Sequence, residues 1–268
     1  MPWQSGGVAR EDGKPSGASA EPSENRFLRP VTTEERESQA RAVEAARATF
    51  SKPRDRQGST YFCADGLTPE ETSGLLVEEM MRVATILGME AVDGGSLSWN
   101  DLELIHRGVF EPVFGEKALG FRDIGHPGVT YPVWEVDGNG KLRIRTQSGS
   151  APKQIRRALD RTVLRLERDV VDLARQGQCS REIQLHEAVL PAVRVYARII
   201  AVHPWEDGNG RTAWLVLNHA LIRCGVLAVA TDPSSEARLA LGRAITTRRQ
   251  RDLEPLADLL VQSIRRSL

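Results

Sequence analysis

A histidine, a carboxylate, a glycine-rich turn and an arginine lie within the run His203-Pro204-Trp205-Glu206-Asp207-Gly208-Asn209-Gly210-Arg211. Glycines allow the backbone to turn tightly and to approach a ligand closely. An apolar, helix-forming segment follows the run directly. The N–H groups of a first helical turn have no acceptor within the helix, and the helix dipole adds positive potential, so such a loop favours bound phosphate.

Three side chains of this run could act on a bound nucleotide. His203 is the group whose ordinary pKa suits a general base near neutrality. Asp207 offers a hard oxygen ligand for Mg²⁺, which commonly binds through a carboxylate and nucleotide phosphates together. Arg211 can donate paired hydrogen bonds to the same phosphates. The run therefore predicts transfer chemistry on a magnesium-bound nucleotide.

Simpler interpretations of the same residues exist, because a lone Gly-Asn-Gly is often only a turn. Asp137-Gly138-Asn139-Gly140 repeats the tetrapeptide, but it has no histidine before it and no arginine or apolar helix after it. We predict that this second copy is the turn of a β-hairpin. An EF-hand calcium loop is excluded for both copies, because its first ligand would be Glu135 or Trp205 and its twelfth Thr146 or Val216.

The elements around the run predict an all-α, mainly helical bundle with an inserted β-hairpin. Capping sequences and apolar periodicity predict helices over residues 32–50, 68–87, 98–109, 153–173, 212–224 and 253–264, with strands over 129–136 and 141–145. Pro191 should kink the apolar segment before His203 or start a new helix there. We expect residues 1–30 to be a disordered N-terminal segment, 31–66 a helix and linker, and 67–268 the catalytic domain.

Composition excludes several other classes of protein. The formal net charge is zero and the isoelectric point is near 7.0, so no global field favours nucleic acid or an anionic membrane. No apolar run approaches the roughly 20 residues of a membrane-spanning helix, and the first residues lack the apolar core of a secretory signal. The three cysteines have no metal-binding spacing. We expect a soluble, cytoplasmic protein, with secretion as an effector left open.

The run resembles the signature of the Fic family, H-x-F-x-D/E-G-N-G-R-x-x-R. Identical residues stand at His203, Asp207 and the four positions 208–211. The resemblance extends to residues 102–110 and 120–122, to the hairpin at the place of the family's flap, and to the last helix, so that it covers roughly residues 68–265.

This resemblance implies a protein adenylyltransferase that moves AMP from ATP to a tyrosine, serine or threonine hydroxyl of a target protein. His203 would deprotonate the hydroxyl, and Asp207 would hold Mg²⁺. Gly208, Asn209, Gly210 and Arg211 would bind the phosphates. The target would dock on hairpin 129–145 by strand addition. A separate inhibitor protein, as in toxin–antitoxin pairs, is a further expected partner.

Two positions depart from the signature. Trp205 replaces phenylalanine and can fill the same place in the core. Trp214 replaces the final arginine, which in the family contacts the terminal phosphate and pairs with an inhibitory glutamate. No internal inhibitory motif is evident. The alternatives are therefore a Fic-like transferase with another nucleotide or donor, or a catalytically weak nucleotide-binding module. The family's kinases carry lysine in place of Gly210, so a kinase is disfavoured.

Overall fold

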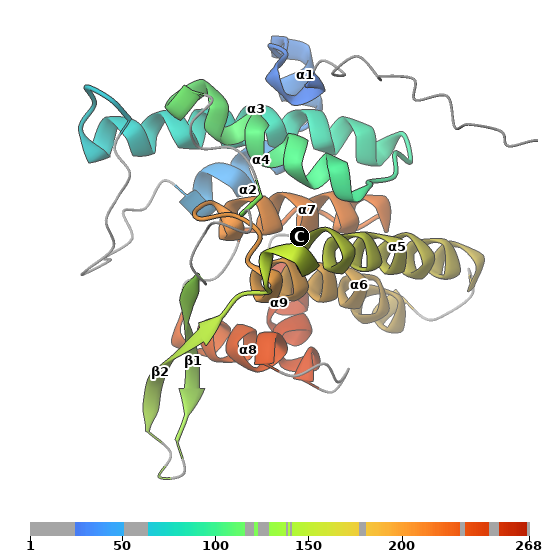
Figure 1. Cartoon of the computed structure of the whole chain (residues 1–268). Coiled ribbons are helices and arrows are strands. Elements are labelled where there is room, and N and C mark those ends of the chain that lie inside the picture. The colour runs from blue at the N-terminus through green and yellow to red at the C-terminus, as the bar shows by residue number, and fades with distance from the viewer. Residues whose placement is uncertain are drawn as a thin grey trace, which may run out of the picture.

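The computed structural model describes residues 25–50, 64–115, 121–122, 129–137, 139, 141–176, 181–230, 234–246 and 252–266. Over these residues the chain is mainly helical with one two-stranded antiparallel sheet, which confirms the predicted fold class (Figure 1). The helices are η1 (Arg26–Leu28), α1 (Thr33–Ser38), α2 (Ala40–Phe50), α3 (Pro69–Val92), α4 (Trp99–Phe114), α5 (Pro152–Gln176), α6 (Arg181–Val202), α7 (Asn209–Arg223), α8 (Ser235–Thr246) and α9 (Glu254–Arg266). The strands are β1 (Thr130–Val136) and β2 (Leu142–Ser148).

Capping boxes start three of these helices where the sequence predicted them. Thr32, Thr68 and Ser98 each accept a hydrogen bond from the amide three residues later, whose acidic side chain accepts one in return. The first predicted helix is nevertheless broken, because α1 ends at Ser38 and α2 begins at Ala40. The Ser38 hydroxyl donates to the Glu35 carbonyl at 2.8 Å and so competes with the backbone pattern there.

The core is built around α6 and α7. Every residue of α7 from Thr212 to Leu221 is buried, and α6, α3 and α4 surround it. The predicted apolar stripe of α5 is buried too, with Ile155, Leu159 and Val163 at most 2% exposed. Helix α6 runs continuously through Pro191, so no new helix starts there. Within the described residues, no helix combines the length and apolar character needed to cross a bilayer.

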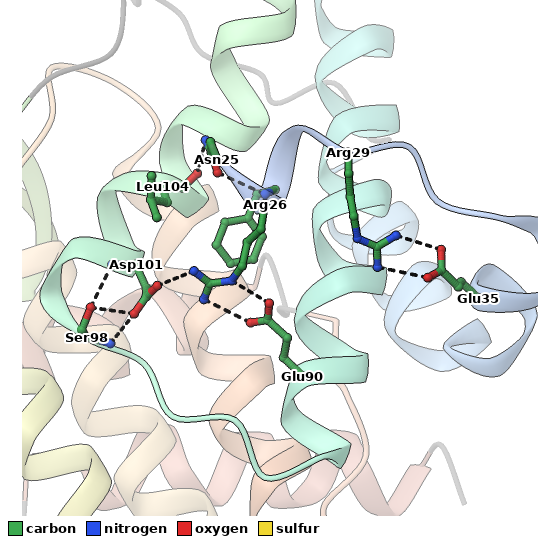
Figure 2. Close-up of polar contacts among 9 residues, drawn as sticks. Asn25, Arg26, Arg29, Glu35, Glu90, Ser98, Asp101 and Leu104 are labelled. Carbon is green, nitrogen blue, oxygen red and sulfur yellow. Dashed lines mark hydrogen bonds and ion pairs between the residues drawn. The ribbon is translucent and has the colours of Figure 1, made fainter. Parts of the chain in front are cut away.

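The N-terminal residues 25–30 pack on the helical core, which corrects the prediction that the disordered segment extends to residue 30. Phe27 is completely buried. Arg26 donates to Glu90 at 2.7 Å and to Asp101 at 2.6 Å, which ties the segment to α3 and to the start of α4 (Figure 2). Residues 1–24 and the predicted linker 51–63 lie outside the described residues. These contacts join the segment to the helices, with Asn25 and Phe27 buried in the same core.

Buried Arg82 on α3 binds the backbone of the same segment. Its guanidinium donates to the carbonyl oxygens of Phe27, of Arg29 at 3.0 Å and of Gly108 at 2.6 Å. Its Nε donates to Glu79 at 2.6 Å. The hydrogen bonds to the Phe27 and Gly108 carbonyls are buried, so Arg82 supplies a donor to buried acceptors and joins the N-terminal turn to both α3 and α4.

The hairpin projects from the helical body beside α8 (Figure 1). Thr130 pairs with Ser148 and Val136 with Leu142. Asp137 closes the turn, because its carboxylate accepts from the amides of Asn139 and Lys141 at 2.9 Å each. The second Asp-Gly-Asn-Gly copy is therefore a hairpin turn, as predicted. Strand β2 is largely exposed.

Candidate active site

His203 is the first residue after α6 and has a left-handed backbone. Its φ is +50°, a conformation that residues with a side chain seldom adopt. Its amide still donates to the Ile199 carbonyl at 2.9 Å, so the turn comes directly after the last helical hydrogen bond. Its ring stacks on Tyr131 of β1, with centroids 4.5 Å apart and planes 5° from parallel. The hairpin and α6 together thus fix the imidazole.

Burial lowers the pKa of His203 to about 4. The Ile200 carbonyl raises that pKa, the Arg122 guanidinium lowers it, and Asp207 raises it by a smaller amount. The imidazole is consequently neutral at pH 7 and has a lone pair available for a proton.

Arg122 binds the C-terminal end of α6, the helix that leads directly to His203. Its Nε donates to the His203 carbonyl at 2.7 Å, and its Nη2 donates to the carbonyls of Ser150 at 2.9 Å and Val202 at 3.3 Å. Its backbone amide donates to the Pro204 carbonyl at 2.9 Å. A cation at a helix C-terminus is favoured by the dipole, so Arg122 stabilises the turn at His203. The sequence indicated Arg122 only as part of a resemblance, since no local spacing relates Arg122 to His203, 81 positions later.

Trp205 and Asn209 close the loop between α6 and α7. The Asn209 side chain donates to the Trp205 carbonyl at 2.8 Å and accepts from the Trp205 amide at 3.1 Å. Trp205 is 1% exposed, which agrees with the core role expected of it. Asn209 was predicted to contact phosphate, but its side chain is buried and occupied by the loop, so only its backbone could make that contact.

A stack of aromatic rings supports Asp207 and Gly208. His106 of α4 lies between Phe110 and Trp205, with both centroid distances 4.5 Å. Its Nε2 is 3.1 Å from the Asp207 carbonyl oxygen. Gly208 has φ +79°, and a Cβ there would overlap the Phe110 ring. Burial lowers the pKa of His106 to about 4, so this ring is neutral and can donate through Nε2. No local pattern indicates this support, because His106 precedes Asp207 by 101 residues.

The N-terminus of α7 lies at the other end of this loop. Asn209 and Gly210 open its first turn, where N–H groups lack an acceptor within the helix. Arg211 lies with Cζ 5.6 Å from the centroid of the Phe110 ring. Asp207 is exposed, and its Oδ1 accepts from the Gly208 amide at 2.6 Å. Asp207, Arg211 and the first-turn amides therefore lie within five consecutive residues at the start of α7.

A magnesium ion fits this donor set only together with a nucleotide. No group of three histidine, cysteine or acidic side chains suited to a metal occurs in the part of the chain that the structure describes. Mg²⁺ binds well through one or two carboxylates when phosphates complete its ligands. Asp207 beside the α7 N-terminus matches that requirement.

Trp214 points away from this site. It is 1% exposed, its Nε1 donates to the Val229 carbonyl at 3.1 Å, and Phe50 of α2 meets its ring edge-on at 5.3 Å. The position of the signature's last arginine is thus part of the packed core that joins α7 to α2.

The segment that contains this loop matches a known protein family. Residues 96–221 match the model of the Fic/DOC family, a span that includes His203, Asp207 and positions 208–211. The chain carries a domain of the Fic/DOC family. No curated protein matches the sequence at a significant level.

Solved structures show the same fold in other Fic proteins. A Fic-domain signaling protein from Bacteroides thetaiotaomicron has 16% identity and a TM-score of 0.52, over 91% of this chain and 90% of that one. Fic-1 from C. elegans has 18% identity and a TM-score of 0.58, over 90% of this chain and 66% of that one. IbpAFic2 covalently tethered to Cdc42 has 19% identity and a TM-score of 0.53, over 89% and 65%. The chain spans about two thirds of the last two structures, and at these identities the likeness concerns the fold alone.

Proposed function

We propose that this protein is an adenylyltransferase that transfers AMP from ATP to a hydroxyl group of a target protein. The observation that carries the proposal is the loop between α6 and α7. At the end of α6 the loop has a neutral histidine, and at the N-terminus of α7 it has Asp207 and Arg211. A base and an anion site on one short loop suit attack of a hydroxyl oxygen on a phosphorus atom.

In the proposed reaction, His203 takes the proton of the target hydroxyl, and the oxygen forms a bond to the α-phosphorus of ATP. The bond from that phosphorus to the β-phosphate bridging oxygen breaks, and pyrophosphate leaves. The first-turn amides of α7 and Arg211 bind the phosphate oxygens on which negative charge gathers. A Mg²⁺ held by Asp207 and the phosphates would neutralise further charge when bound. We expect the reaction in the cytoplasm, as the sequence suggested.

Hairpin 129–145 is the proposed docking element for the target. Its strand β1 packs on α8, where the Trp134 carbonyl oxygen fills the space beside Gly242. Strand β2 is exposed and pairs with β1, so an extended target segment would add beside β2. The solved structure of IbpAFic2 tethered to Cdc42 supports a protein as the acceptor for this fold.

Trp214 supports a second candidate, the same transfer with a donor other than ATP. The indole of Trp214 is uncharged and buried against Phe50, so position 214 supplies no cation to a terminal phosphate. A donor that carries a group other than the β- and γ-phosphates beyond its α-phosphate would lose less binding affinity from the missing cation. Competition of unlabelled nucleotides and diphosphate conjugates against labelled ATP distinguishes the candidates, since the preferred donor competes at the lowest concentration.

Label position tests the proposal directly. The protein is incubated with Mg²⁺, a lysate of its source cells and ATP labelled at either the α- or the γ-phosphate. We expect protein-bound label from α-labelled ATP alone, and its loss in His203→Ala. His186→Ala is the matched control. His186 lies on α6, the helix that leads to His203, but its Nε2 faces Asp258 Oδ1 at 3.3 Å and not the loop. Label from γ-labelled ATP, or full transfer by His203→Ala, would exclude this mechanism.

A further inference from the structure

The chain segments before and after the hairpin both contact the turn at His203. Before β1, Arg122 donates to the carbonyls of Val202 and His203. After β2, the Ser150 amide donates to the same Val202 carbonyl at 2.9 Å. Gly149 lies so close that a Cβ there would be 3.0 Å from the His203 Cβ. The segments that flank the hairpin thus replace water at the end of α6.

Arg122 stabilises a backbone conformation that His203 would not keep unaided. A left-handed residue with a side chain persists only where its surroundings fix it. Arg122 fixes it from two sides, since Nε holds the His203 carbonyl and the Arg122 amide holds the Pro204 carbonyl. The guanidinium is buried, so these hydrogen bonds do not compete with bulk water.

Tyr131 fixes the orientation of the ring that the backbone presents. Its ring lies parallel to the imidazole, and its hydroxyl donates to the Ala201 carbonyl at 3.3 Å. Tyr131 is buried, and β1 is held on α8, where Arg238 lies over Trp134 at 5.5 Å. Strand β1 therefore contacts the candidate base through the Tyr131 ring and pairs through its backbone with the exposed strand β2.

We propose that Arg122 and Tyr131 are positioning residues for His203, so that the hairpin which docks the target also aligns the base. This inference rests on the proposed function for the role of His203 as base. A target strand added to β2 extends the sheet whose other strand carries Tyr131. Docking and alignment of the base are thereby parts of one element.

Gly149→Ala tests the alignment without removing any hydrogen-bonding group. The new Cβ would lie 2.8 Å from Arg122 Nη2, 3.0 Å from the His203 Cβ and 3.1 Å from the Val202 oxygen, so these groups must shift by a few tenths of an ångström. A misplacement of about 1 Å can cost about 100-fold in rate, so we expect a loss of about tenfold in the initial rate of label transfer. The dissociation constant for ATP should stay unchanged, because the atoms nearest the new Cβ belong to Arg122, Val202 and His203 and not to residues 208–211. Gly74→Ala is the control, since nothing lies within 4 Å of its Cβ.

The nuclear magnetic resonance spectrum of the imidazole gives a readout that does not need activity. Stacking on Tyr131 shifts the His203 ring protons upfield, and His203→Ala identifies their resonance. Tyr131→Phe should keep the shift and most of the rate, whereas Tyr131→Leu should lose both. Gly149→Ala keeps the Tyr131 ring, so a moved His203 resonance in that variant reports a displaced imidazole. If the wild type transfers no AMP but Gly149→Ala moves the resonance, the proposed function fails and the positioning stands. An unmoved resonance in Gly149→Ala, or a Gly149→Ala variant that loses ATP affinity as much as rate, would overturn the positioning.

Discussion

Replacement of Gly208 by alanine would test whether the aromatic stack below the loop sets the path of the backbone. Two costs act at once. A left-handed conformation costs a residue with a Cβ about 1–2 kcal/mol, and Gly208 has φ +79°. Overpacking a well-filled site costs about 1–3 kcal/mol more, and the new Cβ would overlap Cε2 and Cζ of Phe110 and lie 2.9 Å from His106 Nε2.

The Phe110 ring has little room to withdraw. It stacks on His106 at 4.5 Å and faces Phe114 at 6.2 Å. We therefore expect Gly208→Ala to lower the free energy of unfolding by about 2–5 kcal/mol in total. Binding of ATP should weaken as well, because the overlap displaces the first turn of α7.

Gly225→Ala provides the matched control at the other end of α7. Gly225 has φ +73° and nothing within 4 Å of its Cβ, so this variant carries the conformational cost without the overlap. The change in the unfolded chain is the same for both and cancels in the comparison. Urea unfolding followed by tryptophan fluorescence measures both. Equal destabilisation of the two variants, within about 0.5 kcal/mol, would show that the stack does not constrain the loop.

Four further outcomes follow from the buried groups. Trp214→Arg should lower the free energy of unfolding by about 3–5 kcal/mol, measured by urea unfolding, because it buries a charge beside Phe50; lost activity in it would reflect unfolding. Burial lowers the pKa of His219 to about 3, below its ordinary value of 6.5, so stability should be full above about pH 6.5 and fall as the pH drops toward 3. His219→Gln should reduce that slope by about 1.4 kcal/mol per pH unit near pH 5, in unfolding curves at several pH values. Arg82→Met should cost about 3 kcal/mol and speed proteolysis near residues 25–30, because it leaves buried carbonyls without donors. With a pKa of about 4, His203 stays neutral above that pH, so the rate of label transfer should be level between about pH 8 and 6.

Local patterns in the sequence were sufficient to predict where α3 and α4 begin and which face of α5 is buried. The boxes at Thr68 and Ser98 depend on residues three positions apart, and they start α3 and α4 where predicted. The stripe on α5 likewise follows from one helical period. Helix α6 shows the limit of such rules, because buried neighbours such as Val189 and Val193 keep it continuous across Pro191.

Contacts between distant segments could not be predicted from local spacing. Nothing around Arg122 indicates that it holds His203, and nothing around His106 indicates that it meets Asp207. Asn209 shows a different limit. An asparagine at this position could direct its side chain to a phosphate or to the loop backbone. In the folded structure the side chain bonds the backbone of Trp205. The docking of Phe27 was missed because one aromatic residue stands out little in a polar segment.

The contacts of Arg122 also have a consequence for synthesis of the chain. The carbonyls that its guanidinium holds belong to residues 28, 80 and 81 positions later. At about 5–20 residues per second, the ribosome reaches His203 about 4–16 s after it has made Arg122. Until then the hairpin has no base to align, and the loop that would bind phosphate does not exist. A nascent or truncated chain that ends before His203 therefore carries the docking strands without the group proposed to act on what they dock.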